Sequence, residues 1–256
     1  MTYLLELSSQ ISSVLLLGFL LGLKHATDAD HVVAVTAILS GRNSLWKSIW
    51  VGISWGLGHS IPLICLGLII LFIKGSFIEY YQNVAPYFEI AVGVMLIILG
   101  VEVFRNISRG NLHMHINDNP PHIHIHSTHN HESNSTPAKK HGKYNHGVLH
   151  GILPMIRPKS FVVGLVHSLA GSAAVLILLI PTINSNLMGI GYLMLFGIGT
   201  IVSMSVVTLI LSFPLKAAFR FPMAQKAILS IAGLANLALG SLLIFEVVTG
   251  YEIIRI

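Results

Sequence analysis

Charged residues are scarce in this chain of 256 residues. Asp, Glu, Lys and Arg make up 10% of the sequence, whereas an ordinary soluble protein has roughly 25%. Hydrophobic residues make up 54%, and several apolar runs are as long as the roughly 20 residues that a helix needs to cross a bilayer. The alternating strands of a membrane barrel are missing from the sequence. The composition therefore predicts an all-α membrane protein.

Other features that the sequence lacks argue against several classes of protein. The one cysteine, Cys65, has no partner for an intrachain disulfide. No GxxxxGK[ST] motif occurs, which excludes ATP hydrolysis by a P-loop. The sequence also has no HExxH motif and no repeated histidine boxes, which argues against an intramembrane protease or di-iron oxidase. The N-terminus carries Glu6 and no basic segment of a cleavable signal, so we expect the first apolar run to be retained.

The apolar runs predict six membrane helices. They lie near residues 14–39, 49–73, 84–104, 160–182, 187–212 and 227–249. With an even number of spans, both termini lie on the same side of the membrane. The only basic residues expected on that side are Lys74 and Arg255. The opposite side has twelve basic residues: Arg42, Lys47, Arg105, Arg109, Lys139, Lys140, Lys143, Arg157, Lys159, Lys216, Arg220 and Lys226. The positive-inside rule then predicts a multi-pass plasma-membrane protein with both termini outside. This topology explains the net charge of +5 without a nucleic acid partner.

The two halves of the sequence match in three places at an offset of about 141 residues. "GLKHATDA" from Gly22 matches "GLVHSLAG" from Gly164, "GLGHS" from Gly56 matches "GIGTI" from Gly197, and "GVMLIILG" from Gly93 matches "GLANLALG" from Gly233. A unit of three spans is odd, so the two halves would be inverted, a recurrent transporter design. We expect one three-helix repeat over residues 1–105 and a second over 151–256.

Ionisable residues interrupt the first predicted span in the heptapeptide "HATDADH", residues 25–31. A charged group at the centre of a membrane helix costs roughly 2.5–3.5 kcal/mol. On a continuous helix His25, Asp28 and His31 would share one face. Imidazole and carboxylate are suitable donors for Ni²⁺, Co²⁺, Zn²⁺ or Fe²⁺. We therefore expect a metal site that also includes Asp30; the alternative is a buried Lys24–Asp28 ion pair.

Three further places have polar residues of interest. His59 lies in the middle of the second span, where it is a metal ligand or a hydrogen-bonding residue between helices. His167 and Ser168 occupy the position that matches His25 in the second half, without the acids. Together with Asn236 they are auxiliary candidates for the metal or its pathway.

The middle of the chain, residues 106–150, carries ten of the fourteen histidines. Its "HMH" and "HIHIHSTHNH" segments include His113, His115, His122, His124, His126, His129 and His131. Histidines interleaved with Asn, Ser and Pro predict a disordered cytoplasmic loop that buffers or senses metal. The alternative is a polar linker.

The heptapeptide resembles the HX4DH signature of the nickel/cobalt transporter family, with His25, Asp30 and His31 in the signature positions. "LGHS" at residues 57–60 resembles the next motif of that family. With six spans and "GLVHSLAGSAA" at the start of the second half, the chain is more similar to the shorter urease-associated nickel transporters than to the eight-span members. Ala170 departs from the eight-span pattern, which has an acid there.

The resemblance implies a transporter of Ni²⁺, Co²⁺ or both, with the metal as substrate, no prosthetic group and no enzymatic activity. It favours uptake by alternating access around His25, Asp28, Asp30, His31 and His59. The implied partners are the bilayer, the metal ion, and cytoplasmic metal chaperones or urease maturation proteins. Efflux through the same site and an intramembrane metalloenzyme stay open as alternatives, and ligand chemistry alone leaves zinc and iron open too.

Overall fold

The computed structural model describes residues 2–39, 44–73, 75–109, 156–170, 185–218 and 221–251, together with residues 180 and 183. The regular elements in these ranges are α-helices, which confirms the all-α class. They are α1 (Thr2–His25), α2 (Ala29–Leu39), α3 (Leu45–Ile73), α4 (Gly75–Ser108), α5 (Pro158–His167), α7 (Asn186–Ala218) and α8 (Pro222–Thr249).

Four of these helices are long and apolar enough to cross a membrane: α3, α4, α7 and α8. The bent pair α1 and α2 adds a fifth if it is one span. Large apolar side chains such as Phe72, Ile98 and Ile231 are exposed on the outer surface, as lipid contact requires. The protein is thus a multi-pass membrane protein. The expected span 160–182 begins with α5, and residues 171–179 lie outside the described ranges.

The expectation of one continuous helix over residues 14–39 is wrong. α1 ends at His25, and α2 begins at Ala29 with its axis bent by 54°. The cause is local, because the amide and hydroxyl of Thr27 both donate to the Lys24 carbonyl, at 2.9 and 2.6 Å. The carbonyl of Asp28 then accepts the first backbone bonds of α2, at 3.1 and 3.2 Å. Thr and Asp favour such caps and turns over helix interiors.

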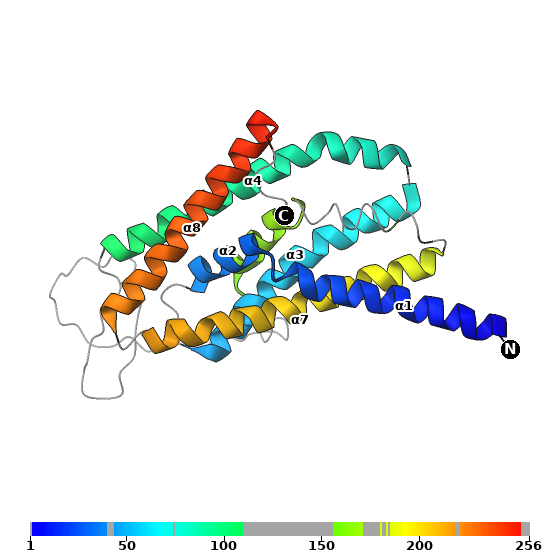
Figure 1. Ribbon diagram of the computed structural model, residues 1–256, viewed down its shortest axis with the longest axis horizontal. Coiled ribbons are helices and arrows are strands. Elements are labelled where there is room, and N and C mark those ends of the chain that lie inside the picture. The colour runs from blue at the N-terminus through cyan, green and yellow to red at the C-terminus, as the bar shows by residue number, and fades with distance from the viewer. Residues whose placement is uncertain are drawn as a thin grey trace, which may run out of the picture.

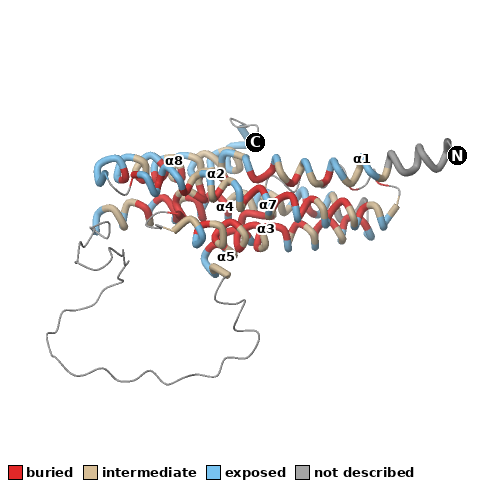
Figure 2. Tube along the Cα trace, turned by 90° about the horizontal axis from the view of Figure 1, so that it is seen from below, coloured by how far each residue is buried: buried red, intermediate tan, exposed pale blue. Residues whose placement is uncertain are grey.

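The helices α1, α7, α3 and α5 pack in a row, and α4 packs with α8 (Figure 1). The short helix α2 lies between them and contacts α8, α7 and α4. Helices α3 and α7 are antiparallel, because Gly52 approaches Ser205 whereas Gly67, further along α3, approaches Leu193, earlier in α7. Buried residues follow the faces where the helices meet (Figure 2). This packing covers one side of the break between α1 and α2, because Ala26 is buried whereas Lys24, Thr27 and Ala29 are exposed.

Glycines let two pairs of helices approach at equivalent points of the two halves. A Cβ on Gly22 of α1 would collide with the carbonyl oxygen of Phe196 on α7. A Cβ on Gly164 of α5 would collide with the carbonyl oxygen of Trp55 on α3. Small residues at such crossings are typical of membrane helices. Each of these glycines lies three residues before the histidine that ends its helix, so the contacts fix where those histidines stand.

Candidate metal centre

Imidazoles from four helices meet in one buried cluster: His25 of α1, His31 of α2, His59 of α3 and His167 of α5. The ring centroids are 4.2 Å apart for His31 and His167, and 6.0 Å apart for His59 and His167. Two sets have ligand atoms within 4.8 Å of one another: His25, His31 and His59, and Asp30, His31 and His167. His31 belongs to both sets and is therefore central to the cluster.

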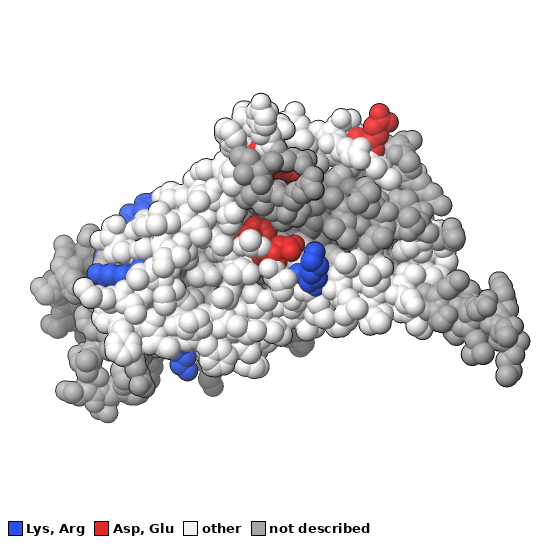
Figure 3. All heavy atoms as spheres, viewed as in Figure 1, with Lys and Arg blue, Asp and Glu red and all other residues white. Residues whose placement is uncertain are grey.

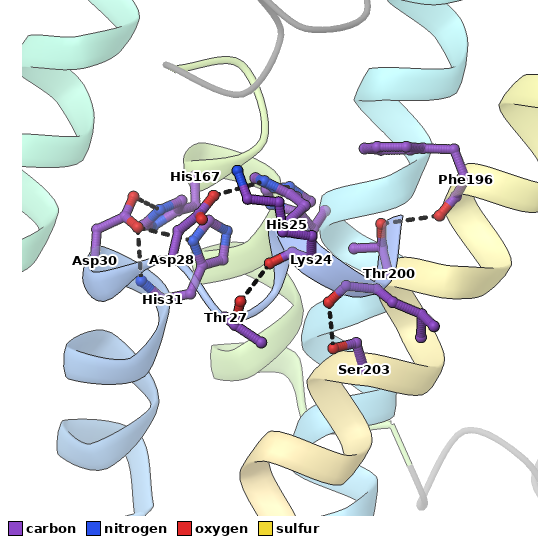
Figure 4. A network of polar contacts seen from close by, with 12 residues as sticks. Lys24, His25, Thr27, Asp28, Asp30, His31, His167, Phe196, Thr200 and Ser203 are labelled. Carbon is purple, nitrogen blue, oxygen red and sulfur yellow. Dashed lines mark hydrogen bonds and ion pairs between the residues drawn. The ribbon is translucent and has the colours of Figure 1, made fainter. Parts of the chain in front are cut away.

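Three of the four imidazoles have a ring nitrogen in contact with an aspartate carboxylate (Figure 4). Asp30 contacts His31 Nδ1 with Oδ1 at 2.9 Å and His167 Nε2 with Oδ2 at 2.6 Å. Asp28 Oδ2 lies 3.1 Å from His25 Nδ1. Because an ionised carboxylate only accepts hydrogen bonds, the contacting nitrogen of a neutral imidazole carries the hydrogen. The opposite nitrogen of each ring then keeps its lone pair, which is the usual way in which carboxylates orient metal-binding histidines.

Three ring nitrogens of the cluster have no partner within the described part of the chain. His31 Nε2, His59 Nδ1 and His167 Nδ1 are buried without a hydrogen bond. The Nε2 atoms of His25 and His59 lie 2.6 Å apart, and with the hydrogen of His25 on Nδ1 it is Nε2 of His59 that donates to Nε2 of His25. Buried polar atoms without partners are rare in native proteins. A borderline-soft divalent metal would use these lone pairs, so the donor set fits Ni²⁺, Co²⁺ or Zn²⁺.

The charge of the cluster also suits a divalent cation. Asp28 and Asp30 place two carboxyl groups beside the imidazoles, and their side chains are only 29% and 13% exposed. Asp28 contacts His25, which disfavours the alternative in which it pairs with Lys24. Figure 3 shows acidic atoms beside the break, next to one basic side chain. A bound dication would offset the charge of the two carboxylates, because a buried charge without a partner is costly.

Two aromatic rings cover the cluster. Trp55 of α3 stacks on His31, with ring centroids 5.8 Å apart and planes at 19°, and lies 6.1 Å from His167. Phe196 of α7 stacks on His25 at 6.0 Å and 25°. Both rings are fully buried. Each ring therefore covers one imidazole with apolar surface, which strengthens the polar contacts of that imidazole.

Neither Trp55 nor Phe196 was predicted from the sequence, although the spacing of each ring in its helix could have indicated it. Trp55 lies four residues before His59, a spacing that puts two side chains on the same helix face. Phe196 lies four residues before Thr200, the residue that matches His59 in the second half. Aromatic residues are common in apolar runs, and so neither ring stood out.

The remaining predicted residues have other positions. Ser168 donates to the Leu165 carbonyl at 2.8 Å and thereby caps the end of α5. Asn236 donates to the Val33 carbonyl at 2.9 Å, which holds α2 against α8. Neither residue belongs to the two ligand sets. The seven loop histidines between His113 and His131 lie outside the described residues, so their role stays a prediction.

Known proteins with similar sequences cover most of this chain. The urease accessory protein UreH of Bacillus sp. (strain TB-90) is 30% identical over 229 residues, which are 89% of each chain. Two chloroplast proteins of Arabidopsis thaliana, FOR GROWTH AND FERTILITY 2 and 1, are 24% and 28% identical over 73% of this chain, but over only 44% and 46% of their own length. No family model and no solved structure matches the chain.

Proposed function

This chain belongs to the family of the urease accessory protein UreH, and from that premise we propose that it transports Ni²⁺, Co²⁺ or both across the plasma membrane. The observation that carries the proposal is the buried cluster of four imidazoles at a helix break inside an apolar bundle. Ionisable groups inside a membrane protein are costly and mark ion pathways. The resemblance of "HATDADH" to the nickel/cobalt signature supports these two metals over zinc and iron.

The ion rests on imidazole nitrogens, and the aspartates hold the rings. His25 Nε2 and His31 Nε2 face away from their carboxylates, and His59 completes the first set of ligands. Asp30 orients His31 and His167 together. Imidazole binds metal only when the ligating nitrogen is deprotonated, so metal affinity falls at acid pH and proton coupling of transport follows naturally.

The two halves are inverted repeats that rock about this site. Support comes from contacts between α4 and α8 that reciprocate: a Cβ on Gly93 would meet the Gly240 carbonyl, and a Cβ on Gly100 would meet the Gly233 carbonyl. The sequence match pairs Gly93 with Gly233 and Gly100 with Gly240, so exchanging the two halves turns one contact into the other. Inverted repeats with a broken helix at the midplane suit alternating access.

The direction of transport is uptake. In the proposed topology both termini face outside and residues 106–150 are cytoplasmic, as the distribution of Lys and Arg favours. Metal that leaves the cluster would then meet the histidines of the loop, which pass it to metal chaperones or urease maturation proteins. The name of the UreH relative, a urease accessory protein, supports such a recipient.

The test is the accumulation of radioactive nickel and cobalt in intact cells that express the wild-type protein, His31→Ala or no protein, at matched membrane abundance. Cys65→Ala serves as a control, because this side chain is exposed on α3 away from the cluster. We expect the wild type and Cys65→Ala to raise accumulation and His31→Ala to match cells without the protein. Lower accumulation with the wild type would show efflux, and equal accumulation with His31→Ala would refute the site. Metal binding without flux in liposomes would favour an intramembrane metalloenzyme.

A further inference from the structure

The two matched segments at the centre of the bundle begin in the same way. Residues 55–60 read "WGLGHS" and residues 196–201 read "FGIGTI", so each starts with an aromatic residue followed by glycine. Trp55 is 1% exposed and Phe196 is 2% exposed. The ligand His59 in the first segment has become Thr200 in the second, whereas the aromatic ring is kept in both. The rings therefore serve something other than direct ligation.

The rings cover different ends of the cluster. Trp55 precedes His59 by one helical turn, about 6 Å toward the N-terminal end of α3. Ser60 donates to the carbonyl of Gly197 at 3.2 Å, which places the neighbouring Phe196 on the other side of His59 along the antiparallel pair. The contacts agree, since Trp55 stacks on His31 and Phe196 stacks on His25. The imidazoles lie between the two rings.

Two buried polar groups accompany the rings. Trp55 Nε1 has no hydrogen-bond partner, and neither has the hydroxyl of Tyr192, which lies one turn beyond Phe196 on α7. Buried donors without partners are rare and call for an explanation. One such donor lies toward each end of the cluster, where water or a hydrated ion would satisfy it once the adjacent ring turned aside.

We propose that Trp55 and Phe196 are paired gates that close the metal cluster from opposite ends and open in turn. The proposal rests on the proposed transport function and adds the residues that separate the ion from either side. In the expected topology Trp55 closes the cytoplasmic end and Phe196 the outer end. A flat apolar ring excludes water when it stacks on an imidazole, and a change of its χ1 rotamer opens a path without moving the helix.

A gate changes the rate of exchange and leaves the affinity nearly unchanged, because it blocks entry and exit alike. The test uses purified full-length protein in detergent, loaded with radioactive nickel and then mixed with excess EDTA. The variants are Trp55→Ala and Phe196→Ala, with Trp55→Leu and Phe196→Leu for use where an alanine variant does not fold. Trp55→Phe and Phe196→Tyr keep a ring. Trp46→Ala on α3 and Phe213→Ala on α7 are controls, because these rings are 63% and 54% exposed.

We expect loss of either ring to speed the release of nickel by about tenfold or more while the equilibrium Kd changes by less than about threefold. The ring-keeping variants and the controls should release nickel as slowly as the wild type. A Kd that rises in step with the release rate, or a release rate that does not change, would overturn the gates. A wild-type protein that binds neither nickel nor cobalt, or a His31→Ala variant that binds them as tightly as the wild type, would instead refute the proposed function, and the gates with it.

Discussion

The two halves of the molecule contribute very unequally to the cluster. The first half supplies three imidazoles and both carboxylates: His25, His31, His59, Asp28 and Asp30. Within the described part of the second half only His167 joins them, and the match to His59 is Thr200, whose hydroxyl bonds to its own helix at 2.9 Å. The halves thus share packing positions but differ in chemistry. In the proposed site the ion would bind mainly to residues of the first half, and the second half would reach it through the Asp30–His167 contact.

Replacement of His31 by alanine should cause the largest loss of nickel binding among variants of the first half. His31 belongs to both ligand sets, and its Nε2 has no other partner. We expect nickel affinity to fall by more than about 100-fold, with loss of transport, measured by calorimetry on purified protein. Val32→Ala, at the next position of α2, is the matched control. If His31→Ala retained wild-type affinity, the ion would bind elsewhere.

Asp30→Asn should rank second, because it weakens the link between the halves and the orientation of two ligands at once. An amide cannot accept from His31 and His167 through two equivalent oxygens. Loss of a carboxylate behind a ligating histidine typically costs 10- to 100-fold in metal affinity, and we expect a fall of about that size. Titration with Co²⁺, followed by its visible absorption, measures it. An unchanged affinity would mean that Asp30 orients neither ring.

His167→Ala separates binding from movement. Three imidazoles remain in the first half, so metal affinity should fall by less than about tenfold. Transport in liposomes should fall by more than the affinity explains, because the contact between the halves is lost. Leu165→Ala is the control, because this side chain lies on the same helix and is 43% exposed. If affinity and transport fell to the same extent, His167 would be an ordinary ligand, and the two halves would differ less in metal binding.

Asp28→Asn should have the smallest effect. Asp28 makes one 3.1 Å contact with His25, and its side chain is 29% exposed, so solvent screens its charge. We expect nickel affinity to fall by less than about tenfold, again by calorimetry. A larger loss than that of Asp30→Asn would reverse the order of the two carboxylates and make Asp28 a direct ligand.

The sequence alone identified the ionisable residues of the site, since charges and histidines stand out in an apolar run. It did not predict the helix break, because the hydrogen bonds of Thr27 to the Lys24 carbonyl compete with the helix only locally. The repeat indicated that His167 mattered, but its contact with Asp30, at the start of α2, depends on how α2 and α5 each dock against the other helices. Such docking follows from side-chain packing between distant segments, which sequence periodicity does not encode.

X-ray absorption spectroscopy of the purified protein loaded with nickel tests the central claim most directly, since it reports the atoms bound to the ion. Imidazole nitrogens of the first half should dominate the shell at about 2.1 Å, with the outer-shell scattering of at least three imidazole rings. His31→Ala should lose this pattern, and Asp28→Asn should keep it. A shell dominated by carboxylate or water oxygens, with one imidazole or none, would contradict the account.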